Sequence, residues 1–331
     1  MMARALTRIE RQHGMIVVST LALVAILAIL ASQVLARQTV DTHRLDLVQQ
    51  RLLADAALAG DRARARAVLG LHARQQVAVQ LNDSWNRPIR RRTLHDRGLP
   101  EAWLHSRLSD EQGKFNLRNL VQHGRVDAEE SAAFLRLCLL LDIPVAQARQ
   151  IARRVVISLV SEERDQGSAD QNTRQAAQEA AQRLGMAALP AQDQAPRPRV
   201  MQDLLSESEL NHAMLERLAD YVTILPRRSW INANTARPEV IAAWVPGLSL
   251  EQARSLLAER DRGRWFLNRG DIYQRLNMPE LDESQLRLGI TSHWFRLDSA
   301  IESQDTWVIS RALLFDDKQN PPQLVWHREG A

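Results

Sequence analysis

An uncharged apolar stretch near the N-terminus constrains this chain more than any other feature. Residues 15–36 carry no charged side chain, and as an α-helix they can cross the hydrocarbon core of a bilayer, which takes about 20 residues. Three arginines and one opposing acid precede the stretch: Arg4, Arg8, Arg11 and Glu10. The positive-inside rule therefore predicts a short cytoplasmic N-terminus, with everything after Arg37 on the far side of the membrane.

The start of this stretch has a distinctive order of parts. Basic residues come first, then Gly14, and the apolar run begins at once at Met15. This order resembles a type IV prepilin leader, which a membrane peptidase cuts after the glycine before methylating the new N-terminus. The resemblance implies that Gly14 is the last leader residue and Met15 the first mature one. A secretory signal cleaved after Ala36 is a second interpretation, although its apolar core would span only about 7–15 residues. An uncleaved anchor is the third.

The composition beyond the anchor is that of an ordinary globular protein. Of 331 residues, 45% are hydrophobic and 25% are charged, which allows one large or two modest domains. Lys and Arg number 43 against 39 Asp and Glu, for a net charge of +4. Such a mixed surface gives little support for nucleic-acid binding. The lone Cys138 has no intrachain disulfide partner, and its apolar surroundings predict a core position.

A helical pattern continues beyond the membrane segment. Apolar residues recur at spacings of three and four at Leu45, Val48, Leu52, Ala56, Ala59, Ala63 and Ala67. They predict one long helix with an apolar stripe against a folded domain. A coiled stalk would need a steadier heptad. Residues 76–108 are expected to form loops with one or two short strands.

The middle of the chain is expected to be helical and the tail extended. Two helices are predicted between Asp127 and Val160, and another from Ser206 or Ser208 to Tyr221. The polar residues 161–200 are expected to hold a short helix and a connection. Three tail segments alternate with a period of two, at residues 293–302, 306–315 and 322–329. They predict an antiparallel sheet that packs on the N-terminal helix, with the helical middle inserted.

No catalytic motif is visible, so the sequence predicts a protein that is not an enzyme. It has no Walker loop, GxSxG or HExxH, and none of the nine His residues has metal-ligand spacing. A catalyst held at the membrane is the weaker alternative.

Residues 231–277 hold the motif closest to a known binding module. Asn234 and Thr235 are expected to cap a helix that ends at Trp244, Pro246-Gly247 to turn the chain, and Ser249 to cap a second helix. A third helix is expected to start at Asp271. The pair resembles a DNA-binding helix-hairpin-helix module, but Ser249 replaces its second glycine, and acidic side chains accompany the arginines. A structural hairpin is predicted, and a membrane-anchored DNA-binding protein of the competence type is the alternative.

Several longer segments together resemble one family. They are DEQGKFNLRNL at 110–120, ADYVTILPRRSWINANTARPEVIAAW at 219–244, and the tail segments SHWFRLDSAIE and VISRALLF. With the leader, they resemble general secretion pathway protein K, a minor pseudopilin family of type II secretion systems. The resemblance implies a single-pass inner-membrane protein with its C-terminal domain in the periplasm. It also implies assembly with the I and J minor pseudopilins and the major pseudopilin at the tip of a short pseudopilus, after processing by the prepilin peptidase.

The resemblance implies an α+β fold, in which a long N-terminal transmembrane helix packs on a small antiparallel sheet and a large helical domain of helix-hairpin-helix or SAM-like type is inserted. The corresponding divisions are a leader at 1–14, a transmembrane helix at 15–36, its periplasmic continuation at 37–75, the first part of the pilin-like body at 76–118, the inserted helical domain at 119–285 and the C-terminal strands at 286–331.

Two further expectations come from the resemblance. Calcium is a candidate cofactor of the exported part, and the corresponding loop at 161–171 carries Glu162, Glu163, Asp165 and Asp170 without the acidic spacing of the family, so no ligands are assigned. Ser19 would be the fifth residue of the mature chain, where most pilins carry a glutamate. Its neutral side chain predicts a subunit at the top of the pseudopilus.

Overall fold

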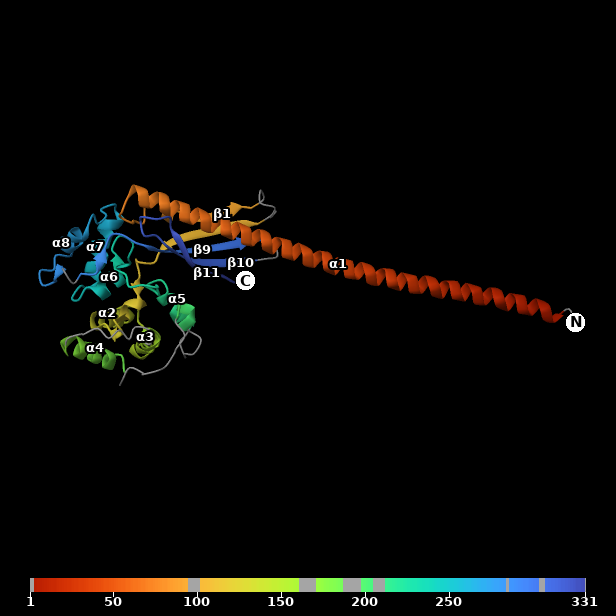
Figure 1. Cartoon of the computed structure of the whole chain (residues 1–331), viewed down its shortest axis with the longest axis horizontal. Helices are drawn as coiled ribbons and strands as arrows, with labels where there is room; N and C mark the ends of the chain where they lie inside the picture. The colour runs from red at the N-terminus through yellow and green to blue at the C-terminus, as the bar shows by residue number, and fades with distance from the viewer. Residues whose placement is uncertain are drawn as a thin grey trace.

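The computed structural model describes residues 3–94, 102–160, 171–186, 198–204, 212–283, 286–303 and 307–330. It has an α+β fold in which one very long helix, α1 (Ala3–Gln75), lies along a sheet and projects beyond it. Figure 1 shows the N-terminal part of α1 extending far from the body. The expected fold class, with its long N-terminal helix, antiparallel sheet and helical middle, is confirmed.

The C-terminal part of α1 packs on the sheet through a different stripe from the predicted one. Ala56, Ala59, Ala63 and Ala67 are exposed, as are Leu45, Val48 and Leu52. The buried stripe consists of Ala54, Ala57, Leu58, Asp61, Ala65, Leu69 and His72. Two of these side chains are polar, and each has a hydrogen-bonding partner: Asp61 accepts from Ser299 at 2.7 Å, and Nε2 of His72 contacts Asp83 at 2.8 Å. The predicted helix is correct, but its assigned face was wrong.

The sheet contains five antiparallel strands in the order β1-β2-β9-β10-β11. Their bounds are β1 (Ile89–Thr93), β2 (Trp103–Asp110), β9 (Trp294–Glu302), β10 (Trp307–Phe315) and β11 (Gln323–Gly330). The three predicted tail strands are β9, β10 and β11. Alternate side chains of the central strands face α1, including Leu104, Leu297 and Val308, and form the core beneath it.

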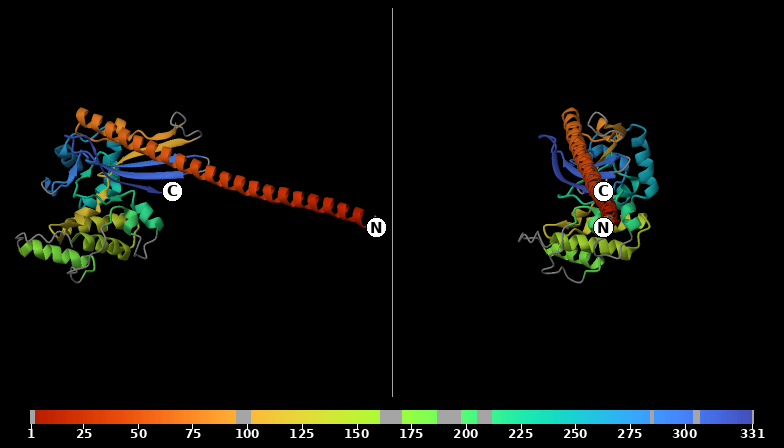
Figure 2. Two further views of the ribbon diagram at one scale, coloured as in Figure 1. Left: turned by 45° about the vertical axis from the view of Figure 1, so that its right-hand side comes forward. Right: turned by 90° about the vertical axis from the view of Figure 1, so that its right-hand side faces the viewer.

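The segment between β2 and β9 forms a second, mainly helical body. β2 and β9 are neighbours in the sheet, with Trp103 opposite Glu302 and Asp110 opposite Phe295. Residues 111–293 therefore leave the sheet at one strand and return to it at the adjacent one. Their helices α2 to α4 lie on the side of the sheet away from α1 (Figure 2). The largest hydrophobic cluster fills this body.

The helical body contains seven α-helices in its described part, with three two-residue strand pairs and short 3-10 turns. The helices are α2 (Ala128–Leu140), α3 (Val145–Val160), α4 (Gln171–Arg183), α5 (His212–Leu218), α6 (Pro238–Trp244), α7 (Leu250–Asp261) and α8 (Arg269–Leu276). The strand pairs are β3 (Phe115–Asn116) with β6 (Val222–Thr223), β4 (Val121–Gln122) with β5 (Arg125–Val126), and β7 (Ile231–Asn232) with β8 (Leu288–Gly289). The 3-10 turns are η3 (Leu117–Leu120) and η4 (Met201–Leu204), with η1 (Ser84–Asn86) after α1.

Local signals predicted some helix ends correctly and others wrongly. Ser249 caps α7, and a full capping box with Gln252 is present. The predicted caps of α6 were wrong, because Arg237 is its N-cap and Asn234 instead bonds to Phe266. Helix α8 starts at Arg269 after Asn268, ahead of the predicted Asp271. The predicted caps Ser206 and Ser208 lie outside the described residues.

The α6–α7 hairpin contributes to the core of the helical body. Gly247 has φ +82°, a conformation that favours glycine, and it turns the chain between the two helices. Leu257 is 2% exposed, whereas Leu256 is only partly buried. Leu257→Ala is therefore expected to cost about 2–5 kcal/mol of unfolding free energy, and Leu256→Ala clearly less. Denaturant titration of the detergent-solubilised chain measures both. Equal losses would contradict the assigned packing.

Candidate functional site

The residues predicted for processing and assembly all lie at the projecting end of α1. Gly14 and Met15 fall within the helix bounds, and Ser19 is exposed on it. The segment Val17–Gln38 is the candidate membrane span in the described part of the chain, with mean hydropathy 2.4 and no burial against the body. Within it, Thr20 donates to Val17 O at 2.9 Å and Ser32 to Ile29 O at 2.8 Å. These bonds satisfy hydroxyls that would otherwise face hydrocarbon.

The predicted hairpin motif begins inside a buried polar cluster that joins the two bodies. The side-chain amide of Asn232 lies 3.0 Å from Val79 O, 3.1 Å from Asp110 Oδ2 and 2.9 Å from Ser292 Oγ. One side chain thus connects the segment after α1, the end of β2 and the start of β9. The side chains of Asn232, Asp110 and Ser292 are all buried.

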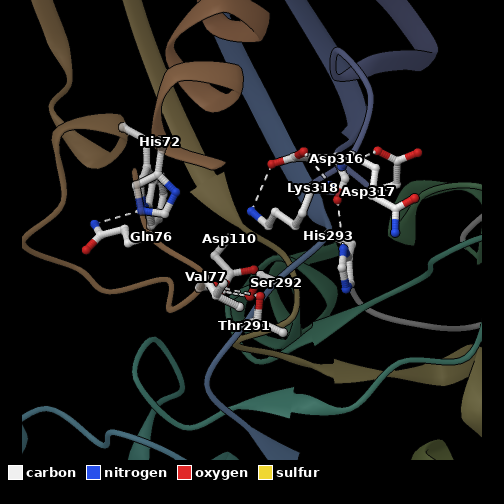
Figure 3. Close-up of polar contacts among 12 residues, drawn as sticks. His72, Gln76, Val77, Asp110, Thr291, Ser292, His293, Asp316, Asp317 and Lys318 are labelled. Carbon is white, nitrogen blue, oxygen red and sulfur yellow. Dashed lines mark hydrogen bonds and ion pairs between the residues drawn. The ribbon is translucent and has the colours of Figure 1, made fainter. Parts of the chain in front are cut away.

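Asp110 is the acceptor at the centre of this cluster. Its carboxylate accepts from Ser292 at 2.6 Å (Figure 3). It also accepts from Thr235 at 2.5 Å and from the Gln112 N–H at 2.8 Å. Burial raises the pKa of Asp110, and these hydrogen bonds offset the shift only in part. The carboxyl group is therefore held by neutral donors, with no ion pair among the described residues.

The adjacent Glu111 has the opposite pKa shift. Burial alone would raise its pKa, but the charges of Lys114 at 2.9 Å and Arg296 at 3.0 Å outweigh it. Thr223 also donates to Glu111 at 2.6 Å. The pKa of Glu111 therefore lies below its ordinary value. Because Arg296 lies on β9, this carboxylate is a second link between the sheet and the helical body.

Acid is expected to weaken this junction through Glu111. The pKa of Glu111 is lower in the folded chain than in the unfolded chain, so the ionised carboxylate stabilises the fold. This stabilisation is fully present at pH values above the unfolded-state pKa. It is lost as the pH falls through the folded-state pKa. Glu111→Gln should therefore reduce the drop in thermal midpoint between about pH 6 and about pH 3. Thermal melts of the full chain in detergent measure it. A drop as large as in the unaltered chain would contradict this role.

The close packing around Asn232 also depends on a glycine. A Cβ on Gly113 would lie 2.8 Å from Thr235 Oγ1 and 2.9 Å from Thr235 O, so the two chain segments approach too closely for any larger residue. Beneath them, the buried guanidinium of Arg260 donates to Ala233 O at 2.9 Å and Ala236 O at 2.6 Å. Residues 232–236 are therefore fixed on both sides.

The end of α1 and the tail add further contacts around this junction (Figure 3). Thr291 donates to Val77 O at 2.8 Å, and the Val79 N–H donates to Ile290 O at 2.8 Å. His293 contacts the carbonyl oxygen of Asp316 at 2.7 Å. The connection after α1 and the entry into β9 are thus held side by side, which fixes how the helical body sits relative to the long helix.

A second group of acids in the helical body, the partly buried Asp127 and the buried Glu130, forms ion pairs with arginines. Asp127 contacts Arg228 at 2.8 Å and Arg287 at 3.1 Å, while Arg287 also contacts Glu130 at 2.9 Å. No group of three metal-ligating side chains occurs in the part of the chain that the structure describes. The calcium candidates at 161–170 lie outside the described residues, so calcium binding there stays a prediction.

The geometry of the α6–α7 hairpin favours packing over phosphate binding. The capping box occupies backbone N–H groups at the N-terminus of α7, where a DNA phosphate would bind. The nearby Arg264 and Arg275 both pair with Glu259, at 3.3 Å and 3.4 Å. Their charges are thus compensated within the hairpin.

Comparison with known proteins agrees with this architecture. A family profile described as "Type II secretion system (T2SS), protein K" matches residues 231–291, and a second with the same description matches residues 113–227. The chain belongs to the type II secretion system protein K family. Its role is therefore that of a minor pseudopilin, a structural component of this secretion system.

Two relatives cover nearly the whole chain. The type II secretion system protein K of Pseudomonas aeruginosa is 27% identical over 304 residues, which are 89% of this chain and 86% of the relative. A solved structure, "The Crystal Structure of the GspK-GspI-GspJ complex from enterotoxigenic Escherichia coli Type 2 Secretion System", contains a chain that matches with a TM-score of 0.62 and 22% identity. The match covers 87% of this chain and 99% of that one. This likeness supports the shared fold.

The sequence revealed the segment around Asn232 but not its partners. Asp110 begins the segment DEQGKFNLRNL and Arg260 lies in the hairpin motif, but nothing in the sequence links either of them, or Ser292, to the segment around Asn232. Cys138 is buried as predicted, and burial raises the pKa of its thiol to about 12.

Proposed function

We propose that this chain sits at the tip of the type II secretion pseudopilus, where it assembles with the I and J minor pseudopilins and initiates or caps the fibre. The proposal includes contact with the major pseudopilin and processing by the prepilin peptidase between Gly14 and Met15. The chain would then act in the export of folded proteins without catalysing a reaction.

The observation that carries this proposal is the continuity of α1. The same helix carries an exposed apolar segment, Val17–Gln38, and a C-terminal part buried on the sheet. Once the segment lies in the inner membrane, the body is held at a set distance above it in the periplasm. A helical stack of such chains joins membrane-embedded and exported parts in one fibre.

Ser19 supports a place at the top of that stack. In the proposed assembly, the glutamate at the fifth mature position of each other pseudopilin pairs with the N-terminal amine of a neighbour. A charged side chain in the middle of a membrane helix costs about 2.5–3.5 kcal/mol on insertion scales. The topmost subunit has no neighbour above it to supply an amine. A neutral Ser19 avoids this cost, while the amine of Met15 remains available to the subunit below.

Ser19→Glu is therefore expected to reduce the number of pseudopili that start, whereas Ser19→Ala is expected to leave it unchanged. The glutamate would place a lone charge in the membrane at the start of each fibre. Counting pseudopili by electron microscopy, in cells that overproduce the major pseudopilin, measures the effect. Equal numbers with Glu and Ala at this position would contradict the role of Ser19.

Co-purification tests the partnership directly. An affinity-tagged full chain, expressed with the I and J minor pseudopilins of the same organism and extracted in detergent, is expected to retain both. The contrary outcome is recovery of the tagged chain alone at concentrations where all three proteins are present.

A further inference from the structure

One face of the sheet is only partly covered. α1 packs on the face that carries Leu297 and Val308. On the opposite face, Leu313 is buried against Leu225 of the helical body, but Trp307 and Ile309 are 48% and 37% exposed. We call this uncovered part the open face; it includes His105 and Arg107 on β2 and Trp307, Ile309 and Arg311 on β10.

The open face ends in a corner against the helical body. A cavity of about 110 Å³ there is lined by Arg296, Arg311 and Trp326 from the sheet and by Arg199 and Thr223 from the helical body. Its floor is therefore formed by both bodies. A partner that covers the open face of the sheet would also contact the residues that line this corner.

The open face and its corner carry excess positive charge. Asp298 pairs with Arg296 at 2.9 Å and with Arg311 at 3.5 Å, and Glu111 pairs with Lys114 at 2.9 Å and with Arg296 at 3.0 Å. Glu302 lies 3.0 Å from His105. In the described part of the chain, neither Arg107 nor Arg199 forms an ion pair. An occupant should therefore bring carboxylates beside an apolar contact.

We propose that the open face is the docking surface for the globular part of a neighbouring pseudopilin, which covers Trp307 and Ile309 and places carboxylates near Arg107 and Arg199. This inference rests on the proposed tip function. Strand β9 runs toward the projecting part of α1, so its end beside Trp307 points to the membrane side (Figure 1). A tip subunit has all its neighbours on that side. Tryptophan is among the residues most often found at interaction hot spots.

The test uses the tagged full chain with the I and J minor pseudopilins. The variant Trp307→Lys/Ile309→Lys is expected to lower the retained partner at least about tenfold, the size typical of a hot spot. Its matched control is Leu139→Lys/Leu267→Lys, which alters two exposed leucines of the helical body and is expected to retain the partners fully. Arg107→Glu/Arg199→Glu should also weaken retention.

Cross-linking tests the same contact independently of the lysine and glutamate variants, whose loss of partners could also come from misfolding. A photoreactive phenylalanine analogue at position 307 is expected to cross-link to I or J, whereas the same group at position 139 is not. Full retention by the Trp307→Lys/Ile309→Lys variant, or equal cross-linking from both positions, would overturn the docking surface and leave the tip function standing. If the unaltered chain retains neither partner, both proposals fail.

Discussion

Replacing Asn232 with leucine is expected to lower the free energy of unfolding by about 3 kcal/mol or more. Its amide lies within hydrogen-bonding distance of Val79 O, Asp110 Oδ2 and Ser292 Oγ, all in the buried junction. Leucine has a similar size but no donor, so these groups lose a partner without access to water. Removing one partner from a buried polar group costs about 1–3 kcal/mol. Denaturant titration of the full chain in detergent measures the change.

The matched control is Asn86→Leu. Asn86 donates to Leu81 O at 2.7 Å in an exposed setting, where water replaces the lost bond, so its cost should stay below about 1 kcal/mol. Combining Asn232→Leu with Asp110→Asn should cost less than the sum of the two single changes, because the residues share one network. An Asn232→Leu cost no larger than that of Asn86→Leu would show that the junction does not depend on this side chain.

Replacing Gly14 with leucine is expected to abolish maturation and, with it, incorporation into pseudopili. The proposed cut leaves Gly14 at the cytoplasmic side of the membrane, where Arg8 and Arg11 hold the leader. A bulky side chain there would block access to the bond before Met15. Mass spectrometry of the membrane-extracted protein should find Met15 as the first residue of the unaltered chain and the intact leader on Gly14→Leu.

Gln12→Ala serves as the control, because it changes the leader without changing the cleaved bond. It should be processed normally. An unaltered chain that starts at Arg37 would favour the secretory signal and remove the membrane helix from the mature protein. Normal processing of Gly14→Leu would contradict the cleavage site.

The pattern along α1 illustrates how far sequence reasoning reaches. Charge-free length predicted the membrane segment, and spacing predicted the helix beyond it. The buried face was assigned wrongly because alanines occur on several sides of the helix. In addition, Asp61 and His72 are polar, and polar residues are expected to be exposed when their hydrogen-bonding partners are not known. Those partners, Ser299 and Asp83, lie on other elements. Periodicity contains no information about them.

The junction shows a similar limit. Period-two alternation identified the tail strands, but nothing local pairs β2 with β9, which are far apart in the chain. Asn234 has the residue type of a helix cap, yet its side chain holds Phe266 instead. Capping was predicted correctly at Ser249, where all the participants are within four residues. Local signals therefore located the elements, while the contacts that join the two bodies required the structure.

The position of this chain within assembled pseudopili tests the tip assignment most directly. Gold-labelled antibody against a tag after Ala331 can be imaged on pseudopili from cells that overproduce the major pseudopilin. The proposal predicts label at one end of each fibre, together with cross-links to the I and J subunits. Label distributed along the whole fibre would contradict it.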